Sequence, residues 1–291
     1  MKTILVWMTI MAAAVGAAAQ QAVEERMVAS PDGLVEISNI SGSVRVQGWD
    51  RAEVEVTGTL GRGTERLEFE GRSGRTVVKV IVPRFASNLR GSDLVVRVPA
   101  GSRLEVSGVS ADIRVDGVAG ILELETVSGS IAVAGSPVSV EAKSVSGALE
   151  LEVAAAPVEA KTVSGPIRIL GARGVLSAAT VSGGIHGVGE GLDRAEFSTT
   201  SGKIVVQGGL NRQGRMTIRS VSGGVDLVLP PDQGTELFVK TFSGGIRHDL
   251  KDASEWSSAR GPGRELEATL GDGSARITVT SFSGSVTIRT R

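Results

Sequence analysis

Apolar and polar residues alternate along most of this chain, in short runs that end in the same few residues. In 122–126 and 140–144 the apolar side chains stand two apart, with Glu or Lys between them. A period of two is typical of a β-strand with one buried and one exposed face. Each run passes into Thr or Ser, often Val, then Ser-Gly and another apolar run, as in ETVSGSIAVAG at 125–135. The pattern predicts short strands joined by tight corners.

The Ser-Gly pair returns at a nearly constant interval. From Ser128 to Ser243 the successive serines are 18, 18, 18, 19, 21 and 21 residues apart. Thr or Ser stands two residues before each of them, and Ile, Leu or Val stands three residues after. A chemical site normally occurs once, so the repeat indicates structural corners, where glycine permits a positive φ or a close backbone approach and hydroxyls bond the backbone. The predicted corner residues are Ser128, Gly129, Ser146, Gly147, Ser164, Gly165, Ser182, Gly183, Ser222, Gly223, Ser243 and Gly244.

The repeat predicts an all-β fold, a single-chain β-solenoid of stacked short parallel strands with 18–21 residues per turn. Residues 106–291 would form the regular solenoid, with a polar loop at 251–265. The longer and less regular strands of 20–105 would form an N-terminal cap and wide first turns. Columns of Ile, Val, Leu and Ala would fill the narrow interior, which agrees with the low aromatic content of 3%.

The first 19 residues predict export. Lys2 precedes an apolar stretch and Ala17-Ala18-Ala19, the order of a secretory signal peptide. No later segment has the roughly 18 to 20 consecutive apolar residues of a membrane helix, so no transmembrane segment is expected in the mature chain. Without residues 1–19 the chain has 30 basic and 32 acidic side chains, a net charge of −2 that argues against nucleic acid or anionic lipid as partner.

Candidate chemistry is sparse. The chain has no cysteine, so disulfides and thiolate sites are excluded. The two histidines, His186 and His248, have no metal-ligand spacing and no Gly-x-Ser-x-Gly accompanies them. Glu123, Glu141 and Glu159 share a column beside Lys143 and Lys161, as in surface charge pairing. We therefore predict no catalytic residue, no cofactor and no metal.

Two tryptophans are the candidate partner-binding residues, because a large aromatic side chain in a ring-poor protein can anchor a partner. They are Trp49 and Trp256. Trp49, next to a turn, is more often explained by packing of the cap, whereas Trp256 falls in the polar loop.

The chain resembles a bacterial envelope family known as putative adhesins, a domain of unknown function built from β-strand repeats. The resemblance rests on the export signal, ISGSVRVQGWD at 40–50, VRVPAGSRLEV at 96–106, LVLPPDQGTELFV at 227–239 and the serial T-V-S-G corners. It implies a repetitive β protein of the cell envelope, in the periplasm or at the cell surface, and supplies no catalytic motif.

Two functions remain open from the sequence. The favoured one is an exported, non-enzymatic binding or scaffold protein that meets an envelope or surface component, protein or glycan, along an extended face. The alternative is a polysaccharide-acting β-helix enzyme, which would need clustered carboxylates, Arg or Lys, or bound Ca²⁺.

The column pattern generates a stability test. Replacing Ile167 with Asp should place an unpaired charge in the interior and cost several kcal/mol, on the order of 3 to 5. Thermal unfolding measures the loss, and an unchanged melt would contradict the inward assignment of this column.

Overall fold

The computed structural model describes residues 21–83, 90–154, 157–250, 253–257 and 263–291; the predicted signal peptide lies outside this range. Every regular element in the described residues is a β-strand. The strands are β1 (Gln21–Val28), β2 (Leu34–Trp49), β3 (Glu53–Leu60), β4 (Arg66–Arg72), β5 (Arg75–Ile81), β6 (Ser92–Pro99), β7 (Arg103–Asp116), β8 (Ile121–Thr126), β9 (Ile131–Gly135), β10 (Ser139–Ser144), β11 (Leu149–Val153), β12 (Val158–Thr162), β13 (Ile167–Thr180), β14 (Ile185–Thr199), β15 (Ile204–Ser220), β16 (Val225–Leu229), β17 (Thr235–Thr241), β18 (Ile246–His248), β19 (Ala253–Ser257), β20 (Arg264–Leu270), β21 (Ala275–Ser281) and β22 (Val286–Thr290).

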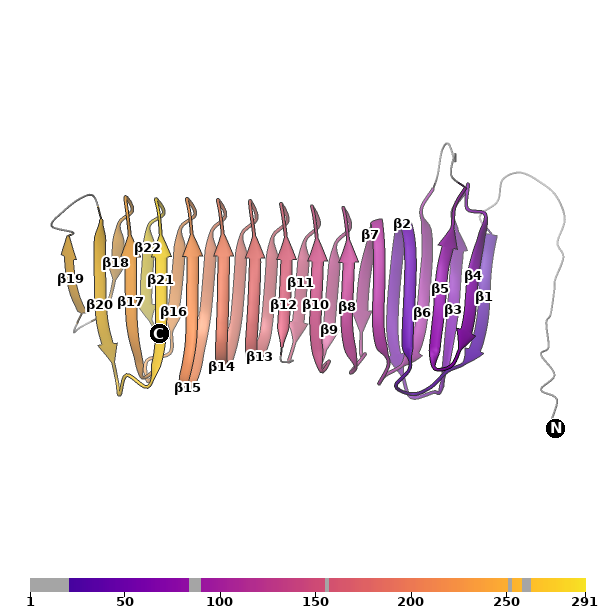
Figure 1. The fold of residues 1–291 in the computed structure, drawn as a ribbon, viewed down its shortest axis with the longest axis horizontal. Helices are drawn as coiled ribbons and strands as arrows, with labels where there is room; N and C mark the ends of the chain where they lie inside the picture. The colour runs from indigo at the N-terminus through magenta and orange to yellow at the C-terminus, as the bar shows by residue number, and fades with distance from the viewer. Residues whose placement is uncertain (1–20, 84–89, 155–156, 251–252, 258–262) are drawn as a thin grey trace.

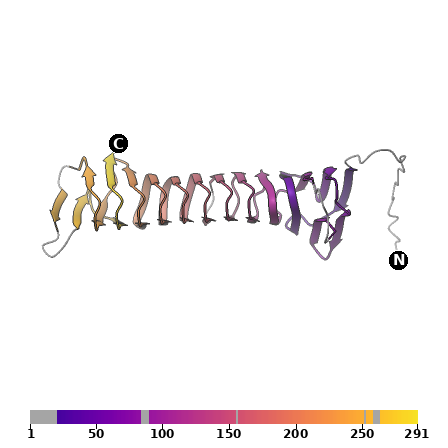
Figure 2. The same cartoon turned by 90° about the horizontal axis from the view of Figure 1, so that it is seen from above.

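The strands lie side by side in one long row and, seen from above, in two layers (Figures 1 and 2). β8, β10 and β12 pair in one layer, and β9 and β11 pair in the other. The longer β7 and β13 pair with strands of both layers, because each runs through the edge between them. The apolar core therefore lies between the layers.

Parallel neighbours are offset by one sequence period, which places like residues beside like. Val140 lies opposite Val158, and Leu149 lies opposite Ile167. All four side chains are buried, with Ile167 only 1% exposed. Because side chains alternate between the two faces of a strand, this register keeps the apolar columns inside and the polar columns outside.

A buried hydroxyl and a glycine hold each Ser-Gly edge. The Gly147 N–H donates to Ser144 Oγ at 2.8 Å, and the Gly165 N–H donates to Thr162 Oγ1 at 3.1 Å. A Cβ on Gly165 would lie 1.9 Å from the carbonyl oxygen of Gly147 on the neighbouring corner. The glycines at 129, 147, 165, 183, 202, 223, 244 and 284 all meet a neighbouring backbone carbonyl in this way, and none of them has a positive φ. Close approach therefore explains these glycines.

The predicted β-solenoid is wrong, because the central strands close on themselves. β7 pairs with β8 and β9, β8 with β10, β10 with β12, and β9 with β11. β13 then pairs with both β11 and β12, which completes a closed barrel core of seven parallel strands. Closure depends on long strands that bend without ending. β13 continues through Gly171 and Gly174, which both have a positive φ. The sequence predicted separate short strands at this place.

The outer strands depart further from a sequential stack. β2 lies between β7 on one side and β5 and β6 on the other. At the opposite end β21 lies between β15 and β17, and β22 lies between β16 and β18 (Figure 1). The strands near the two ends also form antiparallel pairs, which are β1–β3, β3–β6, β4–β5, β17–β20 and β19–β20. A sequence period gives the register of equivalent strands but not their spatial order when later strands insert between earlier ones.

The close approach at the edges generates a paired test. A Cβ at Gly183 would lie 1.8 Å from the Gly165 carbonyl oxygen, whereas at Gly184 the nearest atom is 3.4 Å away. We expect Gly183→Ala to lower the free energy of unfolding by roughly 2–4 kcal/mol and Gly184→Ala to leave it within about 1 kcal/mol. Denaturant unfolding of both variants measures the difference, and equal losses would refute the close-approach explanation.

Candidate binding surface

The serines of the Ser-Gly corners lie exposed at the turns, and several bond back to the backbone of a neighbouring corner. Ser222 Oγ donates to the Thr200 carbonyl oxygen at 3.1 Å. His186 lies on β14 between Arg168 and Val205 of the adjacent strands, and His248 lies on β18 opposite Ile288. The structure thus brings the corner serines together in a line and leaves the two histidines on separate strands.

Trp49 lies at the end of β2 among charged residues of the N-terminal strands. Its Nε1 donates to the Glu53 carbonyl oxygen at 2.9 Å, and the Arg51 and Arg97 guanidinium groups lie 5.0 and 5.9 Å from the ring centroid. Arg97 also donates to Glu55 at 2.9 Å. These contacts hold the indole ring against residues of the N-terminal strands.

Glu55 is a nearly buried carboxylate held by two arginines. Arg26 donates to one of its oxygens and Arg97 to the other. The hydrogen bond from Arg26 lowers the pKa of Glu55, with the positive charges of both arginines adding to the effect against the cost of burial. The cluster joins β1, β3 and β6.

The other candidate tryptophan, Trp256, lies on β19, where its backbone is opposite Glu265 of β20. Its side chain lies outside the described part of the structure. Of the loop predicted at 251–265, residues 253–257 form β19 and 264–265 begin β20; 251–252 and 258–262 lie outside the described residues.

The predicted glutamate column forms a ladder on one outer face. Glu36, Glu105, Glu123, Glu141 and Glu159 are successive partners in the parallel pairing. Lys143, two residues nearer the Ser-Gly edge, contacts Glu141 and lies 3.3 Å from Glu125. Exposed pairs of this kind contribute about 1 kcal/mol or less each. The ladder makes the N-terminal part of this face acidic.

A line of exposed apolar side chains follows the Ser-Gly edge, at the position directly before each corner serine. We name it the Val–Phe ridge. Its members are Val109, Val127, Val145, Val163, Val181, Val221, Phe282 and Phe242, each between 45% and 56% exposed, with Thr200 in the gap between Val181 and Val221.

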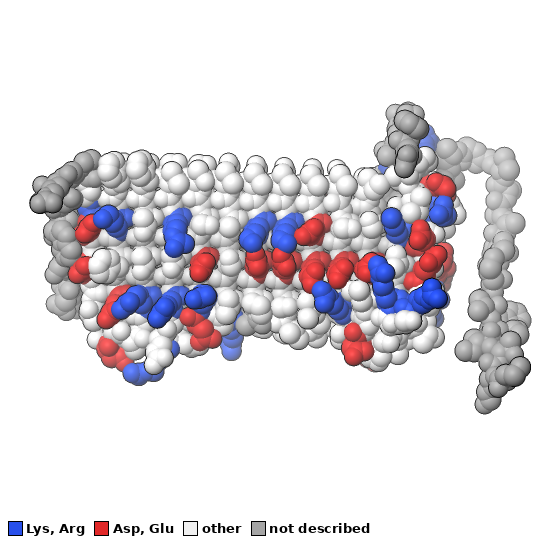
Figure 3. All heavy atoms as spheres, in the orientation of Figure 1, with Lys and Arg blue, Asp and Glu red and all other residues white. Residues whose placement is uncertain are grey.

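Backbone hydrogen bonds fix the ridge residues one strand apart. The Val145 N–H donates to the Val127 carbonyl oxygen at 3.2 Å, and the Val163 N–H donates to that of Val145 at 3.1 Å. In Figure 3 the ridge runs along the upper edge, which is white between the ends; the row below it carries mainly Lys and Arg with some Asp or Glu among them, and the next row is mainly Asp and Glu. The ridge is therefore an apolar border beside a charged face.

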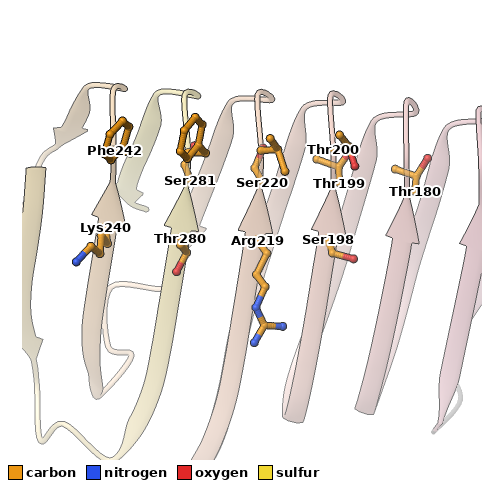
Figure 4. Close-up of a pocket in the computed structure, with 12 residues that line it drawn as sticks. Thr180, Ser198, Thr199, Thr200, Arg219, Ser220, Lys240, Phe242, Thr280 and Ser281 are labelled. Carbon is orange, nitrogen blue, oxygen red and sulfur yellow. The ribbon is translucent and has the colours of Figure 1, made fainter. Parts of the chain in front are cut away.

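The ridge ends in a stacked pair of rings beside a shallow groove of about 490 Å³. The Phe242 and Phe282 ring centroids are 4.9 Å apart and the ring planes differ by 7°. Across the groove from these rings lie Arg219 and Lys240, and Thr200 and Thr280 add hydroxyl groups (Figure 4). The groove thus has one apolar wall and one cationic, hydroxyl-bearing wall.

The repeated Val of T-V-S-G is visible in the sequence, but the predictions above place it on neither the inner nor the outer face of a strand. The alternation of the strand nevertheless indicates the face. The residue two before each corner serine is buried, so the residue after it faces outward if the alternation continues into the corner. Formation of the strands does not require an apolar residue at this outward position, yet Val occurs there in repeat after repeat.

No group of three or more His, Asp or Glu side chains that could hold a metal ion occurs among the described residues. In the same part of the chain no helix is long and apolar enough to cross a membrane.

No family model and no curated protein matches the chain. It is similar to solved structures of a putative adhesin from Bacteroides fragilis (10% identity, 94% of this chain and 99% of that one, TM-score 0.46) and one from Parabacteroides distasonis (10%, 94% and 98%, 0.45). A third, a putative lipid binding protein from Parabacteroides distasonis, has 15% identity, 93% and 96% coverage and a TM-score of 0.38. The first two names agree with the resemblance that the repeated motifs predict.

The Glu55 cluster generates a pH test. Because its folded pKa is lowered, the carboxylate stabilises the fold above the unfolded pKa of about 4.3, and this stability is lost as pH falls through the folded value. Glu55→Gln should therefore lower Tm near pH 7, and the difference from the unsubstituted chain should shrink towards pH 3. Glu65→Gln, at an exposed pair with Arg66, is the control. A Glu55→Gln difference that grows on acidification would contradict the direction of the shift.

Proposed function

We propose that this chain is an exported, non-enzymatic binding protein of the bacterial cell envelope, similar to adhesins, which contacts its partner along an extended edge. The observation that carries the proposal is the Val–Phe ridge. Contiguous exposed apolar surface of several hundred Å² on a soluble protein commonly marks an interaction site. Of the thirteen large apolar side chains that are exposed in the described residues, eight lie on this one border and repeat with the strands.

The ridge is not required by the fold, which supports a role in contact with another molecule. Before six of the ridge residues stands a buried Thr or Ser that accepts a glycine N–H, whereas the ridge side chain itself is exposed; these six are Val127, Val145, Val163, Val181, Phe242 and Phe282. Thr200 occupies one ridge position, and its N–H donates to the Val181 carbonyl oxygen at 3.2 Å as in the preceding corners, whereas the Val221 N–H donates to Thr199. A polar residue is thus compatible with the corner, so the valines add surface chemistry.

Trp49 has no part in this contact, because its ring packs with Arg51 and Arg97 near the N-terminal strands. Export by the predicted signal peptide would deliver the ridge to the periplasm or the cell surface, where the proposed partner, an envelope or surface component, would be met.

The proposal is tested by replacing Val127, Val145, Val163 and Val181 together with Thr, which keeps the β-branched shape and removes apolar contact. Retention of residues 20–291 on isolated envelope material should fall by about ten-fold or more, since each buried methyl contributes up to about 1 kcal/mol. The melt should change little, as is usual for exposed positions.

Ile121, Val138 and Val175 supply the matched control, because they are exposed apolar residues away from the ridge. Their triple Thr variant should be retained like the unsubstituted chain. Equal retention of the ridge variant and this control would refute the ridge as the contact surface.

A further inference from the structure

The C-terminal end of the Val–Phe ridge combines three features in one place: stacked exposed rings, flanking cations and a groove between them. We propose that this end docks on an anionic lipid surface, with Phe242 and Phe282 entering the boundary between headgroups and acyl chains and Arg219 and Lys240 meeting the phosphates. The inference rests on the proposed function and names the chemistry of the partner.

The narrow shape of the ridge favours a deformable partner over a rigid one. The apolar ridge residues border the molecule as a single line along the corner between the two layers, so a flat, rigid partner would touch only their tips. Even complete burial of their exposed parts would remove on the order of 600 Å², below the roughly 800 Å² that each partner buries in a standard interface. A second copy meeting ridge to ridge therefore has too little area, whereas a lipid surface can close around a narrow edge.

The charged side chains lie at different distances from the ridge, measured back along their strands. Arg219 and Lys240 precede the ridge residues Val221 and Phe242 by two positions, which at about 3.3 Å per residue places them roughly 7 Å back from the ridge. Apolar faces of interfacial elements enter about 5–10 Å into the headgroup region, so these two cations would lie at the level of the phosphates.

Most acids at this end lie farther back from the ridge or pair with other cations, but Glu265 lies beside Lys240 and shares its charge with the proposed phosphates, so Arg219 is the main cation of the contact. Glu196 is four residues before Thr200, roughly 13 Å from the ridge, beyond the screening length of about 8 Å at physiological salt. Glu236 bonds Arg276 at 2.7 Å, and Glu265 lies 2.6 Å from Lys240. Glu125 is near the ridge but belongs to β8, in the acidic N-terminal part of the face.

The net charge of the whole chain conceals this local arrangement. β14, β15, β21, β17 and the adjacent β20 carry the cations Arg194, Arg215, Arg219, Arg276 and Lys240 on the outer face of their layer, against Glu196, Glu236, Glu265 and Glu267. The acidic ladder from Glu36 to Glu159 is at the other end. The weakly negative charge of the whole chain therefore leaves an aromatic end with a small positive excess on this face, which favours an anionic surface.

Vesicle flotation of residues 20–291 tests the inference, with phosphatidylcholine vesicles and with vesicles that also contain phosphatidylglycerol. We expect flotation with the anionic vesicles, weaker binding as salt is raised, and little flotation with phosphatidylcholine alone. The double variant Phe242→Ser/Phe282→Ser and the double variant Arg219→Gln/Lys240→Gln should each bind the anionic vesicles about ten-fold more weakly.

Phe238→Ser is the matched control, because Phe238 is 47% exposed on the same strand as Lys240 but does not line the groove. It should bind anionic vesicles like the unsubstituted chain, and thermal melts confirm that all variants are folded. Absence of flotation, equal binding to both vesicle types, or unchanged binding of the double Phe variant would overturn the lipid assignment. So would a dimer in light scattering that is lost in that variant.

The two proposals fail separately. If the Val127, Val145, Val163 and Val181 variant loses envelope retention while the unsubstituted chain ignores anionic vesicles, the ridge stands as a contact surface and the lipid partner is wrong. If that variant keeps full envelope retention, the ridge itself fails.

Discussion

The approach of one backbone corner to the next is the constraint on which this structure depends. At most Ser-Gly edges the buried Thr or Ser hydroxyl accepts the glycine N–H, and the glycine leaves room for a carbonyl oxygen from the neighbouring corner. The same hydroxyl lies 3.3–3.5 Å from that carbonyl oxygen in several repeats. The edge is thereby closed by polar contacts inside the molecule, and the strands on either side are held in register for their apolar columns to meet.

This arrangement also determines what faces outward. With the hydroxyl and the glycine turned inside, the two residues between them must point to the surface. One is the corner serine, which often bonds back to a backbone carbonyl, and the other is the ridge residue. The local structure thus supplies a regular row of outward positions at no cost to the core, and the choice of Val and Phe for most of them is a choice about surface.

Much of the local structure follows from the sequence, and the global arrangement does not. The alternation around Leu122 and Leu124 predicts the buried columns, and the Thr or Ser before each corner predicts a hydroxyl that bonds the backbone. Closure of the seven-strand core could not be predicted, because it depends on bends inside β13 that leave the strand unbroken. The ridge was readable in principle from Val127 onward, whereas the groove required Phe242 and Phe282 to be adjacent although they lie 40 residues apart in sequence.

The insertion of β21 and β22 among earlier strands has a consequence for the order in which the chain folds. β18 pairs with β22, and β17 pairs with β20 and β21; these are the pairings of both strands in the described structure. Strands β7 to β16 can add to one another in order as the chain emerges, but β17 and β18 must leave a space until residues 275–290 arrive to fill it. Such long-range pairing is slow, because the chain loses the entropy of loop closure before the new strand contacts can offset that loss. The aromatic end of the molecule is therefore assembled after the strands from β7 to β16, and the Phe pair forms only once β21 and β22 have joined β15 and β16.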